Sequence, residues 1–77
     1  MSAKQTFKVV LEWDAETQAW VTYVPTLEFL STFGSTREEA LDHTRDAILL
    51  YLESARDEGV EVVMPACEVV DLEVATA

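Results

Sequence analysis

The stretch from Ser35 to Gly59 constrains the fold most, because it carries the start and stop signals of one long helix. The start of this stretch fits a capping box in two registers, because two residues with a hydroxyl are each followed three positions later by a glutamate. The two pairs are Ser35 with Glu38 and Thr36 with Glu39. Gly59 supplies the end, because glycine adopts the left-handed cap conformation at no steric cost. We therefore expect a helix over about residues 36–58.

Apolar residues recur at helical spacing through this stretch, so the helix is expected to lie on another layer. The apolar face carries Ala40, Leu41, Thr44, Ala47, Ile48, Tyr51, Leu52 and Ala55. The opposite, acidic face carries Glu39, Asp42, Asp46, Glu53 and Asp57. Leu49 lies on the flank and Leu50 points away from the apolar face, near His43. An isolated exposed leucine is common, but we favour a contact with another chain at Leu50.

The length and composition of the chain limit the kinds of protein that it can be. A chain of 77 residues forms one domain with a small core, and such domains often gain stability by forming oligomers. At 49% hydrophobic residues the chain is too apolar to be disordered, yet no run is long enough to cross a membrane. Residues 1–6 lack the apolar stretch of a signal peptide. A single cysteine, Cys67, permits no intrachain disulfide, so we expect a cytoplasmic protein.

The net charge of −10, from 15 acidic and 5 basic residues, narrows the class of partner. A nucleic-acid interface needs a basic patch that displaces counterions from phosphates. The basic residues are scattered along the sequence: Lys4, Lys8, Arg37, Arg45 and Arg56. We therefore expect no direct nucleic-acid binding and no membrane binding, and instead a basic protein partner.

Alternating apolar residues before the helix predict strands at about residues 6–13, 19–25 and 27–33. The face of the first strand expected in the core carries Phe7, Val9, Leu11 and Trp13. One side of the third strand carries Leu27, Phe29, Ser31 and Phe33.

A further strand is predicted after the helix, at about residues 67–74. There, one side carries Val70, Leu72 and Val74, and the other carries Val69, Asp71 and Glu73. The predicted fold is α+β in the order β-β-β-α-β, with one helix packed on one face of a small, mostly antiparallel sheet. The whole chain, 1–77, is expected to be a single domain.

Four segments resemble the HicB antitoxin domain in their order and spacing. They are Leu11–Glu16, Trp20–Leu27, Gly34–Leu41 and Arg45–Glu53. The resemblance runs from about Phe7 to Pro65, which is most of the chain. Its most specific part is the helix, where a capping box precedes an Ala-Leu pair and an Arg-acid-Ala-Ile-x-x-Tyr-Leu-Glu run.

This resemblance implies a truncated ribonuclease-H-like fold with the same β-β-β-α-β order. It also implies a role in a prokaryotic toxin–antitoxin system, because HicB-like proteins typically bind and inhibit HicA, a small basic ribonuclease. An acidic protein suits that role, since its carboxylates compete with RNA phosphates for a basic site.

Two departures from the family pattern affect what is expected. Where the family usually has a Leu-Pro-Gly-Cys-like segment, Leu27 is followed by Glu28, Phe29 and Leu30. We expect Phe29 and Leu30 to form an apolar patch at a subunit or partner contact. Full-length antitoxins also carry a C-terminal DNA-binding domain, whereas the residues after Pro65 have room for one strand. A stand-alone HicB-like domain that does not itself bind an operator is therefore expected.

No catalytic, cofactor-binding or metal-binding residue is expected. The best candidate metal ligands are Glu12, Asp14 and Glu16, but we favour a solvated hairpin because turns recruit aspartate for backbone reasons. His43 has no evident nucleophile beside it, so we interpret it as a surface or interface residue. Cys67 lacks a basic neighbour and is expected to be a small buried hydrophobe.

The sequence thus favours a non-enzymatic, HicB-like antitoxin or regulator that forms a homo-oligomer, a dimer or tetramer, and masks a basic HicA-like partner. One alternative is an orphan structural domain that only self-associates. A weaker alternative is a metal-dependent hydrolase. The residues expected to contact a partner are Glu39, Asp42, His43, Asp46, Leu50, Phe29 and Leu30.

Overall fold

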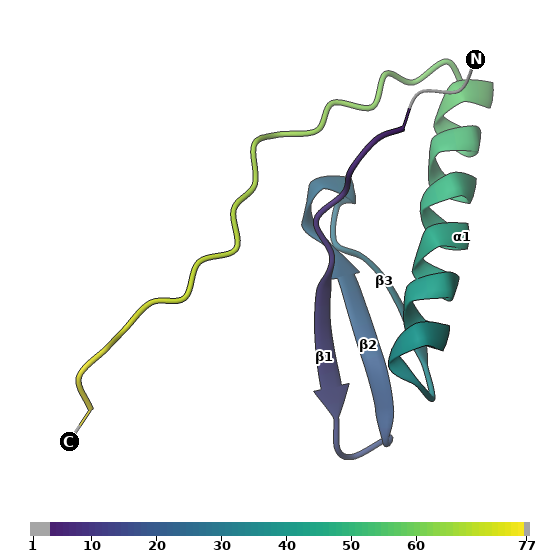
Figure 1. The fold of residues 1–77 in the computed structure, drawn as a ribbon. Coiled ribbons are helices and arrows are strands. Elements are labelled where there is room, and N and C mark those ends of the chain that lie inside the picture. Colours follow the sequence, from purple (N-terminus) through teal and green to yellow (C-terminus); the bar gives the residue numbers. More distant parts are fainter. Residues whose placement is uncertain (1–3, 77) are drawn as a thin grey trace.

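The structure is a computed structural model that describes residues 4–76. Within that range the chain forms a three-stranded sheet followed by one helix, in two layers (Figure 1). The elements are β1 (Val10–Asp14), β2 (Ala19–Val24), a 3-10 turn (Pro25–Leu27), β3 (Leu30–Gly34) and α1 (Arg37–Asp57). The predicted α+β class and the β-β-β-α part of the predicted order are confirmed.

The sheet is an antiparallel meander in the order β1-β2-β3. The first hairpin turns on Asp14, whose side chain accepts a hydrogen bond of 3.0 Å from the Glu16 amide. Asp14 thus has the backbone role in a turn that aspartate commonly takes. Near the turn of the β1–β2 hairpin, Trp13 and Trp20 are cross-strand partners. Their ring centroids are 5.5 Å apart in an edge-to-face arrangement.

The core lies between the sheet and the apolar side of α1. Strand alternation turns Thr22 and Val24 of β2 toward the helix, and both are fully buried. The buried apolar residues are Val24, Leu27, Ala40 and Ile48. The side chains packed around them are Phe7, Val9, Leu30, Tyr51, Leu52 and Val62. The predicted apolar face of the helix is confirmed in this cluster. The first strand begins later than predicted, at residue 10 instead of 6, and of its predicted core face Phe7 and Val9 pack on the cluster whereas Trp13 is 48% exposed.

A pair of buried hydroxyls also joins the two layers. Thr44 on α1 donates to the Ala40 carbonyl at 2.7 Å, and its oxygen is hydrogen-bonded to the Thr22 hydroxyl on β2. Thr22 also lies 3.3 Å from the Thr32 carbonyl on β3. Every hydroxyl in this network therefore has a partner, which removes the cost of burying it.

Both ends of α1 are capped by local side chains and backbone. Of the two possible registers, the structure adopts the one in which Thr36 accepts from the Glu39 amide at 3.1 Å. The Glu39 carboxylate contacts the amide and hydroxyl of Ser35 in return. At the other end, Gly59 has φ of 71°, and the Val60 amide bonds the Ala55 carbonyl at 2.8 Å. This is the Schellman geometry expected of a glycine stop.

The third strand is shorter than predicted, and Leu27 does not share a side with Phe29, Ser31 and Phe33 as predicted. Residues 25–27 form a 3-10 turn, and Glu28 and Phe29 both have positive φ, at 55° and 57°. These two residues reverse the chain and break the alternation that the sequence pattern assumes. Leu27 is therefore buried, whereas Phe29 and Phe33 are 67% and 66% exposed.

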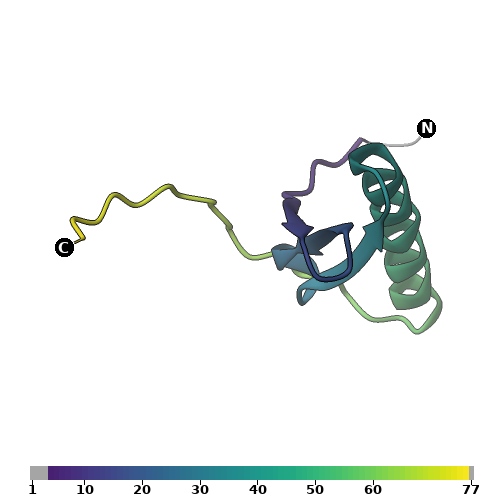
Figure 2. The same cartoon turned by 90° about the horizontal axis from the view of Figure 1, so that it is seen from below.

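The strand predicted at residues 67–74 is not formed. Within residues 58–76 no residue belongs to a strand, and the chain runs away from the sheet in an extended path (Figures 1 and 2). Apart from Val62 and Cys67, its apolar side chains are exposed, with Leu72 at 83%. An apolar alternation makes a strand only when an edge is hydrogen-bonded to it, and this segment has no such partner within residues 4–76. Residues 60–76 are called the C-terminal arm below.

Candidate functional site

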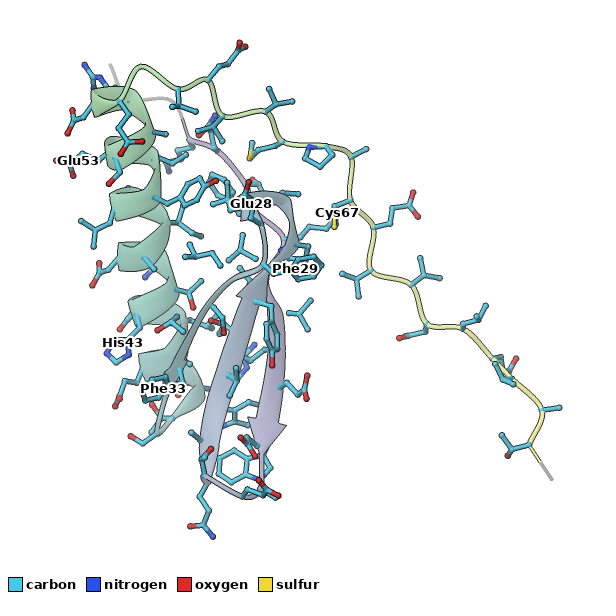
Figure 3. The ribbon with its side chains drawn as sticks, turned by 180° about the vertical axis from the view of Figure 1, so that it is seen from behind. Glu28, Phe29, Phe33, His43, Glu53 and Cys67 are labelled. Atoms are coloured by element: carbon cyan, nitrogen blue, oxygen red, sulfur yellow. The ribbon has the colours of Figure 1, made fainter. Side chains whose placement is uncertain are left out.

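The acidic face of α1 forms a continuous row along the exposed side of the helix. Residues spaced by three or four along a helix share a face, so the row extends over the whole length of α1. It consists of Glu39, Asp42, His43, Asp46, Leu50, Glu53 and Asp57, and all seven are exposed. Figure 3 shows the side chains of His43 and Glu53 pointing outward from the helix. The structure thus brings five of the seven predicted contact residues together: Glu39, Asp42, His43, Asp46 and Leu50.

Most charges of this row are available to a partner. Asp42 pairs with Arg45 at 2.9 Å, but both side chains are about 70% exposed, and such a pair contributes little stability. Glu39 is used in the helix cap. Asp46, Glu53 and Asp57 are engaged in no hydrogen bond or ion pair within the described residues, so the row presents uncompensated negative charge.

His43 connects the helix to the edge of the sheet. Its Nδ1 lies 2.7 Å from the Phe33 carbonyl oxygen on β3. Because a carbonyl only accepts, Nδ1 carries the proton in this bond and Nε2 faces outward as an acceptor when the ring is neutral. The contact positions the ring at the boundary between the acidic row and β3, which is a structural role that the sequence did not indicate.

Phe29 and Leu30 do not form the common patch that was predicted. Leu30 packs against the core cluster, whereas Phe29 is exposed at the tip of the turn before β3. A phenylalanine at positive φ is uncommon, and its neighbour Glu28 is held in the same left-handed region. The turn therefore displays an aromatic ring on a backbone conformation that costs free energy.

The two leucines that break the helical pattern lie on opposite flanks of α1. Leu50 borders a shallow hollow on the β3 side, together with Leu30, Tyr51 and Val60. Leu49 instead lines a larger groove on the β1 side. Both side chains are mostly exposed, at 64% and 59%, so neither contributes to the core of a single copy.

The groove on the β1 side has a volume of about 670 Å³. It lies between α1 and the segment that leads into β1, and its apolar wall includes Phe7, Val9, Leu41, Leu49 and Leu52. Basic residues border it, although the sequence suggested that they are scattered. Lys4 and Arg45 line the groove, Arg56 lines the adjoining hollow and Lys8 lies along the β1 edge.

The remaining candidates for chemistry are not brought together. Within residues 4–76, no group of three or more His, Cys, Asp or Glu side chains has the spacing to hold a metal ion. Glu12, Asp14 and Glu16 stay on the first hairpin as separate side chains. Cys67 is half-buried on the arm, not fully buried as expected.

Comparison with known proteins adds no relative: no family model matches the chain, and no curated protein matches it significantly. None of the helices in the described part of the chain is long and apolar enough to span a membrane. The protein's function is therefore inferred from the surfaces described above and from the sequence resemblance.

Proposed function

We propose that the protein is a non-enzymatic binding module that masks a small basic protein, as HicB-like antitoxins mask HicA-type ribonucleases. The observation that carries this proposal is the exposed acidic row on α1. Its carboxylates compete with RNA phosphates for the same basic surface of a ribonuclease. Electrostatic complementarity of this kind raises the association rate and the specificity of binding more than the affinity.

An apolar anchor within the charged row supports the same proposal. Charges at the rim of an interface contribute little binding energy, which comes instead from a few desolvated apolar or aromatic side chains. Leu50 lies among the acids, and Phe29 is displayed at the turn before β3. We assign attraction to Asp46 and Glu53, and burial against the partner to Leu50 and Phe29.

The first experiment is affinity capture from the source cell at low salt, followed by mass spectrometry. The proposal requires recovery of a small basic protein whose RNA cleavage is inhibited when this protein is added. Recovery of no basic protein, or of one whose RNA cleavage is unaffected, would rule the antitoxin function out. It would leave the self-associating domain as the better description.

A matched pair of variants then tests the surface. Asp46→Asn with Glu53→Gln removes two charges from the acidic row, and Glu61→Gln with Glu68→Gln removes two from the arm. Both pairs are exposed and change the net charge equally. We expect the first pair to slow association with the captured protein about tenfold at low salt, and the second to change it less than twofold. Equal effects would mean that only net charge matters.

A further inference from the structure

We propose that the C-terminal arm is exchanged between two copies of the protein. Residues 67–74 of one copy pair with the open edge of β1 in the second copy, and their apolar side chains fill its β1-side groove. This proposal is independent of the antitoxin function, because neither the arm nor the β1 edge belongs to the acidic row.

The β1 edge is the open edge of the sheet. β1 hydrogen-bonds only to β2, so within the described chain its outer side has no strand partner. The other edge strand, β3, lies against α1 and is tied to it through His43. An uncovered edge with free backbone groups readily accepts another strand. A hollow bordered by Thr6, Val10 and Leu11 extends along the β1 edge, and Val69 of the arm lines it without pairing with β1.

The groove has the position that a fourth strand requires. Because α1 lies mainly over β3 and β2, its flank toward β1 is uncovered, which leaves Leu49 and Leu52 facing the groove. A strand added beside β1 points every second side chain toward the helix layer, and so into this groove. Val70, Leu72 and Val74 are spaced in this way.

The arm also complements the groove in charge. Three of the five basic residues of this acidic chain line the groove or the β1 edge, at Lys4, Lys8 and Arg45. The arm carries acids between its apolar residues, at Glu68, Asp71 and Glu73. Docking of the arm therefore pairs opposite charges at the rim and apolar groups at the centre.

The surface that a single copy leaves uncovered is large enough for a stable dimer. A compact protein of 8.6 kDa exposes about 4,700 Å². This chain exposes 6558 Å², roughly 1,900 Å² more than that scaling gives, whereas a standard interface buries about 800 Å² on each partner. Its radius of gyration of 14.9 Å likewise exceeds the ~11.5 Å of a compact chain of this length.

The course of the arm favours a second copy over closure on its own sheet. Val62 packs on the core cluster and Val69 lines the hollow beside β1, but the arm forms no strand pairing there, and its last residues lead away from the sheet (Figure 2). Pro65 favours an extended conformation at Met64, which stiffens the connection to residues 67–74. Exchange makes the same contacts as closure without folding the end of the arm back onto its own sheet, which is the usual basis of a swapped dimer.

The deciding experiment uses the unmodified chain. Copies labelled with ¹³C are mixed with unlabelled copies, unfolded and refolded together, and isotope-filtered NOEs are recorded between the Leu72 methyl groups and Phe7, Val9 or Leu11. Light scattering gives the mass of the same sample. We expect twice the chain mass and NOEs that connect labelled with unlabelled copies. A single-chain mass, or NOEs confined within one copy, overturns the exchange in favour of closure.

A matched pair of variants locates the contact. Leu72→Asp puts a charge on the side of the arm that enters the groove, and Glu73→Gln alters the adjacent residue on the other side. Loss of the buried leucine is expected to raise the dimer dissociation constant at least about tenfold, with little effect from Glu73→Gln. Circular dichroism checks that the helix is retained. A Leu72→Asp dimer as tight as the unmodified one would instead locate the interface on the open sheet face near Phe33.

Discussion

Gly34 lies where β3 ends and the first turn of α1 crosses over it. A Cβ atom at this position would stand 2.5 Å from the Ala40 amide nitrogen and 2.9 Å from the Glu39 carbonyl carbon. Both are backbone atoms that cannot move aside independently of the helix. A glycine between a strand and a helix commonly serves to turn the chain, whereas here Gly34 permits close approach of the two layers.

We expect Gly34→Ala to lower the free energy of unfolding by about 3 kcal/mol, because the helix must shift away from the sheet. Gly59→Ala is the matched control, since its Cβ meets nothing within 4 Å and only its positive φ of 71° is strained. That variant should lose about 1 kcal/mol. Urea unfolding measures both, and equal losses would show that close packing at Gly34 is not the constraint.

The hydroxyl pair Thr22–Thr44 gives a second test at this scale. Thr44→Val keeps the volume but removes the bond to Ala40 and to Thr22, which retains the Thr32 carbonyl as a partner. We expect a loss of about 1 kcal/mol. In the Thr44→Val variant, Thr22→Val should lower the free energy of unfolding by less than it does in the unmodified protein. A double-mutant cycle should therefore give a coupling of about 1 kcal/mol. Strictly additive losses would contradict the hydrogen bond.

At the scale of elements, the turn before β3 has an unfavourable backbone. Two successive residues have positive φ, a conformation for which Asn and Gly are strongly preferred, and here they are Glu28 and Phe29. We expect Glu28→Asn with Phe29→Gly to raise the free energy of unfolding by about 1–2 kcal/mol, with Glu28→Gln as a control that leaves the strain in place. The same change should weaken binding to the basic partner, since it removes an exposed anchor. A less stable variant would mean that Phe29 packs favourably where it is.

The elements that the sequence predicted well are those determined by local signals. The helix bounds agree within one residue because Thr36 and Gly59 cap it through bonds to their own neighbours. β2 follows from its dense aromatic and β-branched residues. The failures concern non-local pairing: the pattern in residues 67–74 is that of a strand, but a strand also needs an edge. The acidic row was predictable from helical spacing, whereas the His43–Phe33 contact and the groove depend on how α1 crosses the sheet.

At the scale of the whole molecule, the excess of negative charge destabilises the folded state. The 15 acidic residues face 5 basic ones, and the ion pair between Asp42 and Arg45 is exposed. Repulsion among like charges on a small surface destabilises the folded state, and salt screens it over a Debye length of about 10 Å at 0.1 M. We therefore expect the melting temperature to rise by several degrees when sodium chloride is increased from low to moderate concentration, measured by circular dichroism at constant protein concentration.

Exchange of the arm predicts that the melting temperature also depends on protein concentration. A dimer is stabilised by mass action, so its melting temperature rises with protein concentration, whereas that of a closed monomer does not. Salt should raise the melting temperature at every protein concentration if net repulsion dominates. If much of the repulsion arises when two acidic copies meet, salt should raise the melting temperature least at low protein concentration, where the protein is monomeric. A fall with salt at all concentrations would mean that the pairing of arm acids with the groove residues Lys8 and Arg45 outweighs the repulsion.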